Sequence, residues 1–182
     1  SARRRIADKI QKAWMIIKEK CREPGYRNFM NQGIVGCRGA LLGAVYLQMI
    51  EGGYENEIQK IYEKHTQLVD QYLTREGHCA EGGGYFEYSF STSILLWHVY
   101  AKYTKQGWRQ VVPKSFQKTG RYLEALMSVN DPRGSRNPIN CDRGGEVMTL
   151  LLVFMTLVCD FPEGNNYLLA RFTGNKVEKI QK

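Results

Sequence analysis

The sequence has few of the residue patterns that build metal sites or disulfide-rich folds. Its five cysteines are widely separated, odd in number and form no CxxC pair, which indicates neither a zinc site nor a disulfide scaffold. The three histidines lack the spacing of a helical metal-binding pair. We therefore expect no metal and no cofactor. The cysteines are Cys21, Cys37, Cys79, Cys141 and Cys159.

Alternating strand patterns, low-complexity segments and clean repeats are also missing. Two segments are apolar on nearly every face, residues 34–50 and residues 147–159. The second is too short to cross a bilayer, which needs about 20 residues, and the first contains Arg38 and several glycines. Both are predicted to be core helices that are buried all round. We therefore expect no membrane partner.

The composition favours a folded protein with acidic partners. Of the 182 residues, 43% are hydrophobic, and 26 Lys and Arg against 18 Asp and Glu give a formal net charge of +8. This length fits one domain over residues 1–182. The excess charge favours polyanionic sugars, nucleic acid or an anionic surface, without choosing among them. Because the sequence has no recognised nucleic-acid motif, we expect no nucleic-acid partner.

Helical periodicity dominates the chain. Apolar residues recur at helical spacing over residues 6–17, 54–72 and 112–126. His65 lies on the second of these stripes and is predicted to be a hydrogen-bonded core residue. The connections are of modest length, which implies that consecutive helices are antiparallel neighbours. The predicted fold is therefore all-α, built of antiparallel helical hairpins.

Two longer loops, residues 75–87 and 130–145, precede apolar helices and are rich in Gly, Asn, Asp or Pro. If the hairpins alternate in direction, both loops lie at one end of the helix array and form a cleft there. In the first loop, Gly82-Gly83-Gly84 runs into Tyr85 and Glu87, and glycines let a ligand approach the backbone closely. Such a turn is a common rim of a binding cleft, although a flexible helix connection explains it equally well.

Three segments, taken in order, match the motifs of one family. Asn28-Phe29, followed by a helix of small residues, is similar to an Asn-Trp pair and inner helix. Gly83-Gly84-Tyr85-Phe86-Glu87 with Ser89 is similar to an Asp-Gly-x-Tyr-x-Glu-Gly/x-Ser loop. Residues 131–142 are similar to a loop with Asp-Pro-x-Gly and Pro-x-x-x-Asp. Over roughly residues 25–172, the chain thus resembles the heparinase II/III-like polysaccharide lyases.

The resemblance implies both a fold and an activity. The catalytic region of that family is an incomplete α/α toroid of helical hairpins, followed by a β-sandwich region that is absent here. The chain holds about three hairpins at the usual helix lengths. The resemblance therefore implies part of an α/α toroid from a larger lyase, partnered by the missing β-sandwich region or a second subunit. It also implies a periplasmic or secreted protein that acts on acidic, uronic-acid polysaccharide.

Family members cleave such polymers by β-elimination, which needs three groups. The sugar carboxylate must be neutralised, a base must remove the adjacent proton, and an acid must protonate the leaving oxygen. We assign the neutralisation to Asn31, with Asn28 and Gln32 as substrate-binding amides. Amides near the start of a helix are also ordinary caps, so a structural role for each of them stays open.

The proton transfers are assigned to Tyr85, Tyr88 and His78, the phenols and the imidazole of the first loop. A Tyr in such a loop is also a common core anchor with a satisfied hydroxyl. In the family, a catalytic Tyr follows the loop acid by about one helical turn, whereas residues 90–92 here are Phe-Ser-Thr. Neither Ser nor Thr replaces a phenol as a base. Either Tyr88 has taken over, or the activity is lost, or the alignment slips by a turn.

Charged residues complete the predicted binding site. Glu87 is predicted to bind a sugar hydroxyl or to orient a neighbour, or simply to begin a helix, where the dipole favours acids. Arg38, inside an apolar helix, must either pair with a buried acid or line an anionic subsite. Arg133 and Arg136 are predicted to bind carboxylate or sulfate, although a solvated, self-paired loop is equally consistent with them.

Two other functions stay open. A noncatalytic polyanion-binding helical module would keep the cleft without the catalytic phenol. Another α/α toroid enzyme, such as an unsaturated-uronyl hydrolase, would use an Asp, but the sequence has no strong paired-carboxylate signature.

Overall fold

The computed structural model of the chain describes residues 2–22, 31–79, 81–126, 135–136, 145–146 and 148–173. These residues are predominantly helical, which confirms the predicted all-α class. They divide into two compact units. Unit 1 comprises Ser1–Tyr72 and Thr92–Val111, and unit 2 comprises Leu73–Ser91 and Val112–Lys182. One helix, α4 (Gly83–Thr104), contributes its first part to unit 2 and the remainder to unit 1.

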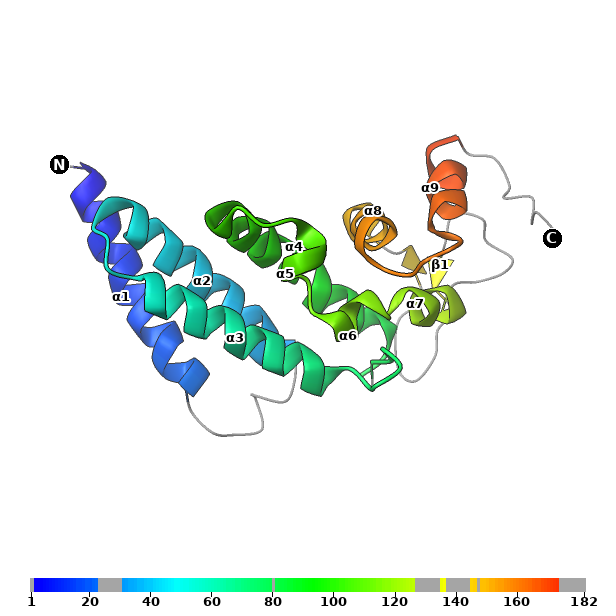
Figure 1. Cartoon of the computed structure of the whole chain (residues 1–182), viewed down its shortest axis with the longest axis horizontal. Helices are drawn as coiled ribbons and strands as arrows, with labels where there is room; N and C mark the ends of the chain where they lie inside the picture. The colour runs from blue at the N-terminus through cyan, green and yellow to red at the C-terminus, as the bar shows by residue number, and fades with distance from the viewer. Residues whose placement is uncertain are drawn as a thin grey trace. The chain divides into compact units, whose positions relative to one another are not determined.

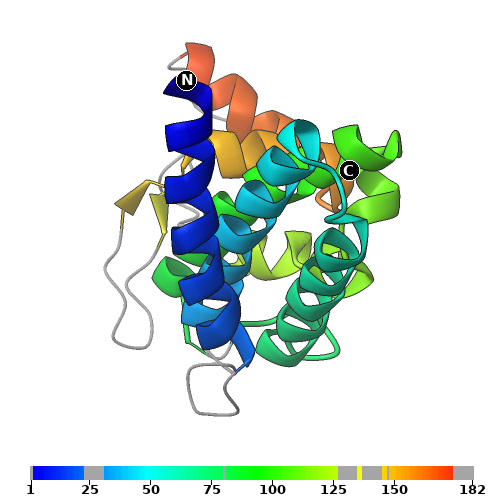
Figure 2. The same cartoon turned by 90° about the vertical axis from the view of Figure 1, so that its left-hand side faces the viewer.

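Unit 1 begins with three long antiparallel helices, α1 (Ala2–Arg22), α2 (Asn31–Ile50) and α3 (Glu55–Tyr72), which lie side by side (Figure 1 and Figure 2). The central helix, α2, packs against both of the others. Its small residues allow close contact, because a Cβ atom at Gly43 would lie only 3.3 Å from the indole of Trp14. The short helix α5 (Trp108–Val111) follows α4 and ends unit 1.

The turn between α2 and α3 is built by glycines and one glutamine. Gly52 and Gly53 have positive φ angles of 76° and 81°, a conformation that glycine adopts without steric cost. The backbone N–H of Tyr54 donates to Oε1 of Gln48 at 2.6 Å, and Nε2 of Gln48 donates to Glu55. Gln48, which interrupts the apolar pattern of α2 in the sequence, therefore ties the end of one helix to the start of the next.

The apolar stripes predicted for unit 1 are confirmed on α3 and partly wrong on α1. On α3, the buried residues are those of the predicted stripe, including Ile58, His65 and Leu68. On α1, Trp14 is buried as predicted, but Ile6 is half-exposed. The rotation of α1 follows the packing of the large indole against Gly43, which brings the small Ala7 side chain inward in place of Ile6.

Helix α2 is long and apolar enough to cross a membrane, judged by length and composition alone. The interior helix of a water-soluble bundle meets the same criterion. Here α2 packs between α1 and α3, and its buried side chains include Ile34, Leu41 and Leu47. The prediction that this helix is buried all round is wrong, since Met49 is 75% exposed.

Unit 2 consists of shorter elements. The sequence pattern predicted one helix over residues 112–126, but the structure has two, α6 (Lys114–Gln117) and α7 (Gly120–Leu126). Two further helices, α8 (Thr149–Val158) and α9 (Gly164–Thr173), pack against each other. All the residues of the predicted stripe are buried despite the break, namely Val112, Phe116, Thr119, Leu123 and Leu126.

The break between α6 and α7 has a visible cause. A Cβ atom at Gly120 would lie 2.1 Å from the carbonyl oxygen of Asp160, so only glycine permits this approach. The backbone N–H of Asp160 also donates to the carbonyl of Gln117 at 3.0 Å. The connection between α8 and α9 therefore packs against the turn at residues 117–120 and hydrogen-bonds to it. In a continuous helix, the carbonyl of Gln117 would instead accept an intrahelical hydrogen bond.

Phenylalanine rings form the core of unit 2. Phe116 of α6 lies 4.7 Å from Phe90 and 6.2 Å from Phe86 between ring centroids, and 6.4 Å from Phe154 of α8. The ring of Phe116 is tilted relative to Phe90 and Phe154 and nearly parallel to Phe86, and contacts between aromatic rings at such separations are favourable. This cluster joins the first turns of α4 to α6 and α8.

Two features of unit 2 differ from the sequence predictions. Helix α8 was predicted to be buried all round, but Leu150 and Leu157 are 56% and 51% exposed, because α9 and the phenylalanine cluster cover only part of its surface. The predicted second loop also contains two strands of two residues each, β1 (Ser135–Arg136) and β2 (Gly145–Glu146). They pair antiparallel, with Ser135 opposite Glu146.

Candidate functional site

The loop that precedes α4 is fixed by its own hydrogen bonds and by α6. The backbone N–H of Thr74 donates to the carbonyl of His78 at 2.8 Å, and the N–H of His78 donates to Oγ1 of Thr74 at 3.1 Å. Gly77 has a φ of +85°, and a Cβ atom there would lie 2.9 Å from the backbone of Lys118. Residues 74–78 therefore form a hydrogen-bonded turn that packs against the backbone at Lys118.

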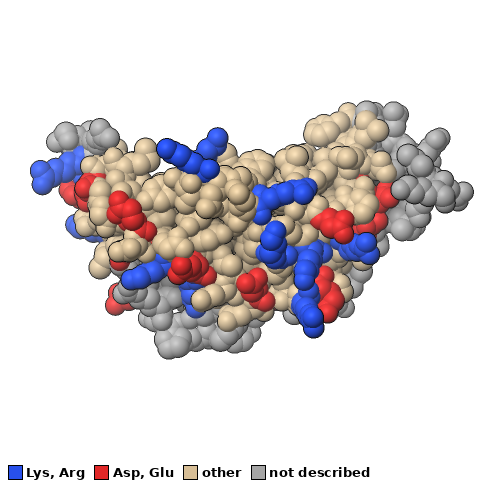
Figure 3. Space-filling view, viewed as in Figure 1, with Lys and Arg blue, Asp and Glu red and all other residues tan. Residues whose placement is uncertain are grey.

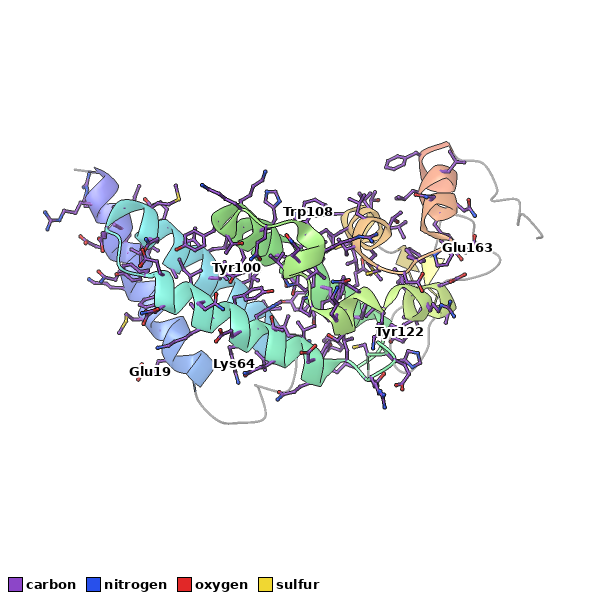
Figure 4. All side chains as sticks on the ribbon, in the orientation of Figure 1. Glu19, Lys64, Tyr100, Trp108, Tyr122 and Glu163 are labelled. Carbon is purple, nitrogen blue, oxygen red and sulfur yellow. The ribbon has the colours of Figure 1, made fainter. Side chains whose placement is uncertain are left out.

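Tyr122 of α7 positions the predicted site residue His78. Tyr122 is labelled in Figure 4. Its hydroxyl donates to the carbonyl of Cys79 at 3.1 Å, and its ring lies 5.4 Å from the exposed imidazole of His78. The sequence carried no signal for Tyr122, because a contact across 43 residues leaves no local pattern.

The first turns of α4 present two tyrosines outward. Gly82 has a φ of +88°, and its carbonyl accepts the N–H of Phe86 at 3.0 Å, which begins the helix. Tyr85 and Tyr88 are 54% and 53% exposed, and residues three apart in a helix are neighbours on its surface. Within the described part of the chain, no hydrogen bond engages either hydroxyl. We call these two side chains the tyrosine face.

Glu87 points the other way. Its side chain is only 8% exposed, and Oε1 accepts the backbone N–H of Met148 at 2.5 Å. Met148 is the N-cap of α8 and makes no capping hydrogen bond with its own side chain. Glu87 therefore supplies the acceptor that the start of α8 needs, and the dipole of that helix favours a carboxylate there.

The remaining predicted site residues lie in unit 1, in strand β1 or outside the described residues. Asn31 is the buried first residue of α2, Gln32 beside it is exposed, and Arg38 is half-buried on the same helix. These three belong to unit 1, whereas His78, Tyr85, Glu87 and Tyr88 belong to unit 2. Asn28 and Arg133 lie outside the described residues, and only the backbone of Arg136 is described, in β1.

Unit 1 contains a buried polar group that is structural. His65 is fully buried, its Nε2 lies 3.0 Å from Oγ of Ser93, and its ring meets Trp97 edge-on at 5.6 Å. This confirms the predicted hydrogen-bonded core histidine. Burial lowers its pKa to about 3, because removing a charged imidazolium from water is costly. A residue with no access to solvent does not contact a polymeric substrate.

Acidic side chains gather where α7 meets the α8–α9 connection. Burial raises the pKa of Glu124, and the neighbouring Glu163 adds to this effect. Burial likewise raises the pKa of Tyr167, with contributions from Glu124 and Glu163. Arg121 and Asp160 form an ion pair at 3.8 Å. Among the described residues, no group of three or more His, Cys, Asp or Glu side chains could hold a metal ion.

Charges of both signs are dispersed over the described residues on one face of the molecule. On the face shown in Figure 3, lysine and arginine side chains are interspersed with acidic ones. The net charge of +8 gives a general attraction to polyanions, and this face shows no single basic patch.

Comparison of the chain with protein-family models, with curated proteins and with solved structures gave no match.

Proposed function

We propose that this chain is a polysaccharide lyase-type domain, part of an α/α toroid, that binds acidic uronic-acid polysaccharide through the tyrosine face of unit 2. The observation that carries the proposal is the outward placement of Tyr85 and Tyr88 directly after the glycine turn. A Tyr combines a flat apolar ring with a hydroxyl, which suits it to partly wet binding surfaces. The excess positive charge supports an acidic polymer.

The proposed chemistry is β-elimination with a phenol as the proton-transfer group. One helical turn after Glu87, Phe90 is fully buried in the aromatic core, and Ser91 donates its hydroxyl to the carbonyl of Tyr88 at 3.2 Å. Tyr85 and Tyr88 are therefore the phenols that the first turns of α4 offer to solvent. His78, exposed beside Tyr122, is the proposed second proton-transfer group.

A noncatalytic polyanion-binding module is the second candidate, and one observation favours it. Glu87, the acid of the loop motif, is buried and already bonded to the backbone of Met148. If Glu87 is not available to the substrate, the aromatic surface can still bind a polymer, but the site lacks the acid of the family's loop motif.

An absorbance assay separates the two candidates. β-Elimination leaves an unsaturated uronate that absorbs ultraviolet light, so the chain is incubated with heparin, heparan sulfate, alginate and chondroitin sulfate. We expect binding with a weak absorbance signal or none, because Phe-Ser-Thr occupies residues 90–92, where the family has its phenol. A measurable signal supports the lyase, and binding without product supports the noncatalytic module. Any signal should disappear in the Tyr85→Phe, Tyr88→Phe double variant. A strong signal that survives in this variant contradicts the assignment of the phenols.

Neutral glucans provide the control for the acidic-polymer part of the proposal. Affinity for the acidic polymers should fall steeply with added salt, because exposed charges are screened over about 10 Å at 0.1 M ionic strength. Equal affinity for a neutral glucan would refute an acidic substrate.

A further inference from the structure

We propose that Glu87 is a positioning residue for glycan binding, which anchors α8 to α4 and does not itself contact the polymer. This inference rests on the proposed function, because it concerns the orientation of the tyrosine face. It assigns to the acid of the loop motif a role different from direct substrate binding.

The burial and bonding of Glu87 support this role. In sequence it lies between Tyr85 and Tyr88, yet its side chain is 8% exposed whereas theirs are 54% and 53% exposed. Its Oε1 accepts the N–H of Met148 at 2.5 Å. A buried carboxylate that already accepts a backbone hydrogen bond would have to break that bond to reach a sugar hydroxyl. Leaving a buried donor without its acceptor costs about 1–3 kcal/mol.

The contact complements the aromatic core. Phe86 and Phe90, which flank Glu87, pack on Phe116, and Phe116 in turn lies near Phe154 of α8. Apolar contacts of this kind are weakly directional, whereas a hydrogen bond constrains distance and angle. The bond from Glu87 to Met148 therefore fixes the rotation of α4 relative to α8. Because Tyr85 and Tyr88 adjoin Phe86 and Glu87 in the helix, the same bond fixes where they point.

The test compares three variants whose charge changes are equal. Glu87→Ala removes the acceptor, Glu87→Gln keeps an acceptor without the charge, and Glu76→Gln removes the same charge from the exposed turn before α4. Loss of a negative charge by itself strengthens binding to a polyanion. Positioning predicts the opposite sign for Glu87→Ala, so electrostatics cannot produce the expected result.

Two measurements are made on the full chain, heparin affinity and amide hydrogen exchange. We expect Glu87→Ala to weaken heparin binding at least fivefold relative to Glu76→Gln, with Glu87→Gln between the two. We also expect exchange to accelerate in Glu87→Ala at the amide of Met148, which loses its acceptor, and at the first turn of α8, which loses its anchor. Glu76→Gln should leave that exchange unchanged.

Each adverse result has a distinct meaning. Unchanged exchange in Glu87→Ala would show that Glu87 does not anchor α8, and the inference fails. The inference also fails if Glu87→Ala shows faster exchange but binds heparin as tightly as Glu76→Gln does. Glu87 would then anchor α8 without orienting the tyrosine face. If the wild-type chain does not bind heparin, the proposed function fails, and the exchange data alone would still measure the anchor.

Discussion

One pair of tyrosines in each unit shows two different uses of the phenol. In unit 1, the hydroxyl of Tyr62 donates to the carbonyl of Val111 at 2.6 Å, and that of Tyr100 donates to Oε1 of Gln59 at 2.6 Å. Their rings stack with centroids 3.7 Å apart, and burial raises the pKa of both phenols. In unit 2, Tyr85 and Tyr88 face solvent. A phenol committed to an internal acceptor holds the fold together, whereas an outward phenol is available to a ligand.

The largest expected effect tests the tight backbone contact of unit 2. Gly120→Ala should lower the free energy of unfolding by about 3 kcal/mol or more, because its Cβ would lie 2.1 Å from the carbonyl oxygen of Asp160, a backbone atom. Gly107→Ala in unit 1 is the matched control, since its nearest neighbour is the flexible Gln110 side chain at 3.5 Å. Denaturant unfolding followed by circular dichroism measures both. Equal stability of the two variants would contradict the described contact.

The next largest expected effect is a loss of stability at low pH, caused by His65 in unit 1. The pKa of folded His65 is about 3, below its ordinary value of 6.5. The unfolded chain therefore takes up a proton as pH falls below about 6.5, while the folded chain does not until about pH 3, so stability is lost over this range. At pH 4 the loss attributable to this residue is on the order of 3 kcal/mol relative to pH 7.

Tryptophan fluorescence can isolate this effect. The three tryptophans, Trp14, Trp97 and Trp108, all belong to unit 1, so their emission reports on the unit that contains His65. The acid-induced loss should be smaller in His65→Gln than in wild type, and unchanged in the exposed control His78→Gln. The same slope in wild type and His65→Gln would show that the buried imidazole does not drive it.

A smaller effect sharpens the tyrosine comparison directly. Tyr62→Phe should lower the free energy of unfolding by about 1 kcal/mol, because the buried carbonyl of Val111 loses its donor. Tyr88→Phe should leave stability unchanged, since its hydroxyl faces solvent. Thermal unfolding of the two variants tests this difference. If Tyr88→Phe proves as destabilising as Tyr62→Phe, the outward assignment of Tyr88 is wrong.

The smallest effect is expected at the ion pair of unit 2. Arg121 and Asp160 are 77% and 71% exposed at 3.8 Å, and exposed pairs contribute little. Arg121→Gln should change the free energy of unfolding by less than about 0.5 kcal/mol. A larger loss would mean that this pair, in addition to the glycine contact, holds α7 to the α8–α9 connection.

Sequence periodicity predicted the helices better than it predicted their exposed faces. The stripe on α3, including the buried His65, followed from spacing because a helix repeats its environment every three to four residues. The break before Gly120 did not follow from spacing, because it depends on Asp160, which lies 40 residues further along the chain. The same holds for Glu87, for which the local pattern left several roles open and whose hydrogen bond to Met148 lies 61 residues along the chain. Long-range partners leave no periodic trace.

The most direct test of the central claim is the affinity of the chain for heparin with and without the tyrosine face. Replacement of both Tyr85 and Tyr88 by Ala should raise the dissociation constant at least tenfold, about 1.4 kcal/mol. Tyr103→Ala, at a half-buried position of unit 1, should change it less than twofold. If the double variant binds heparin as tightly as the wild type, glycan recognition does not occur at the tyrosine face.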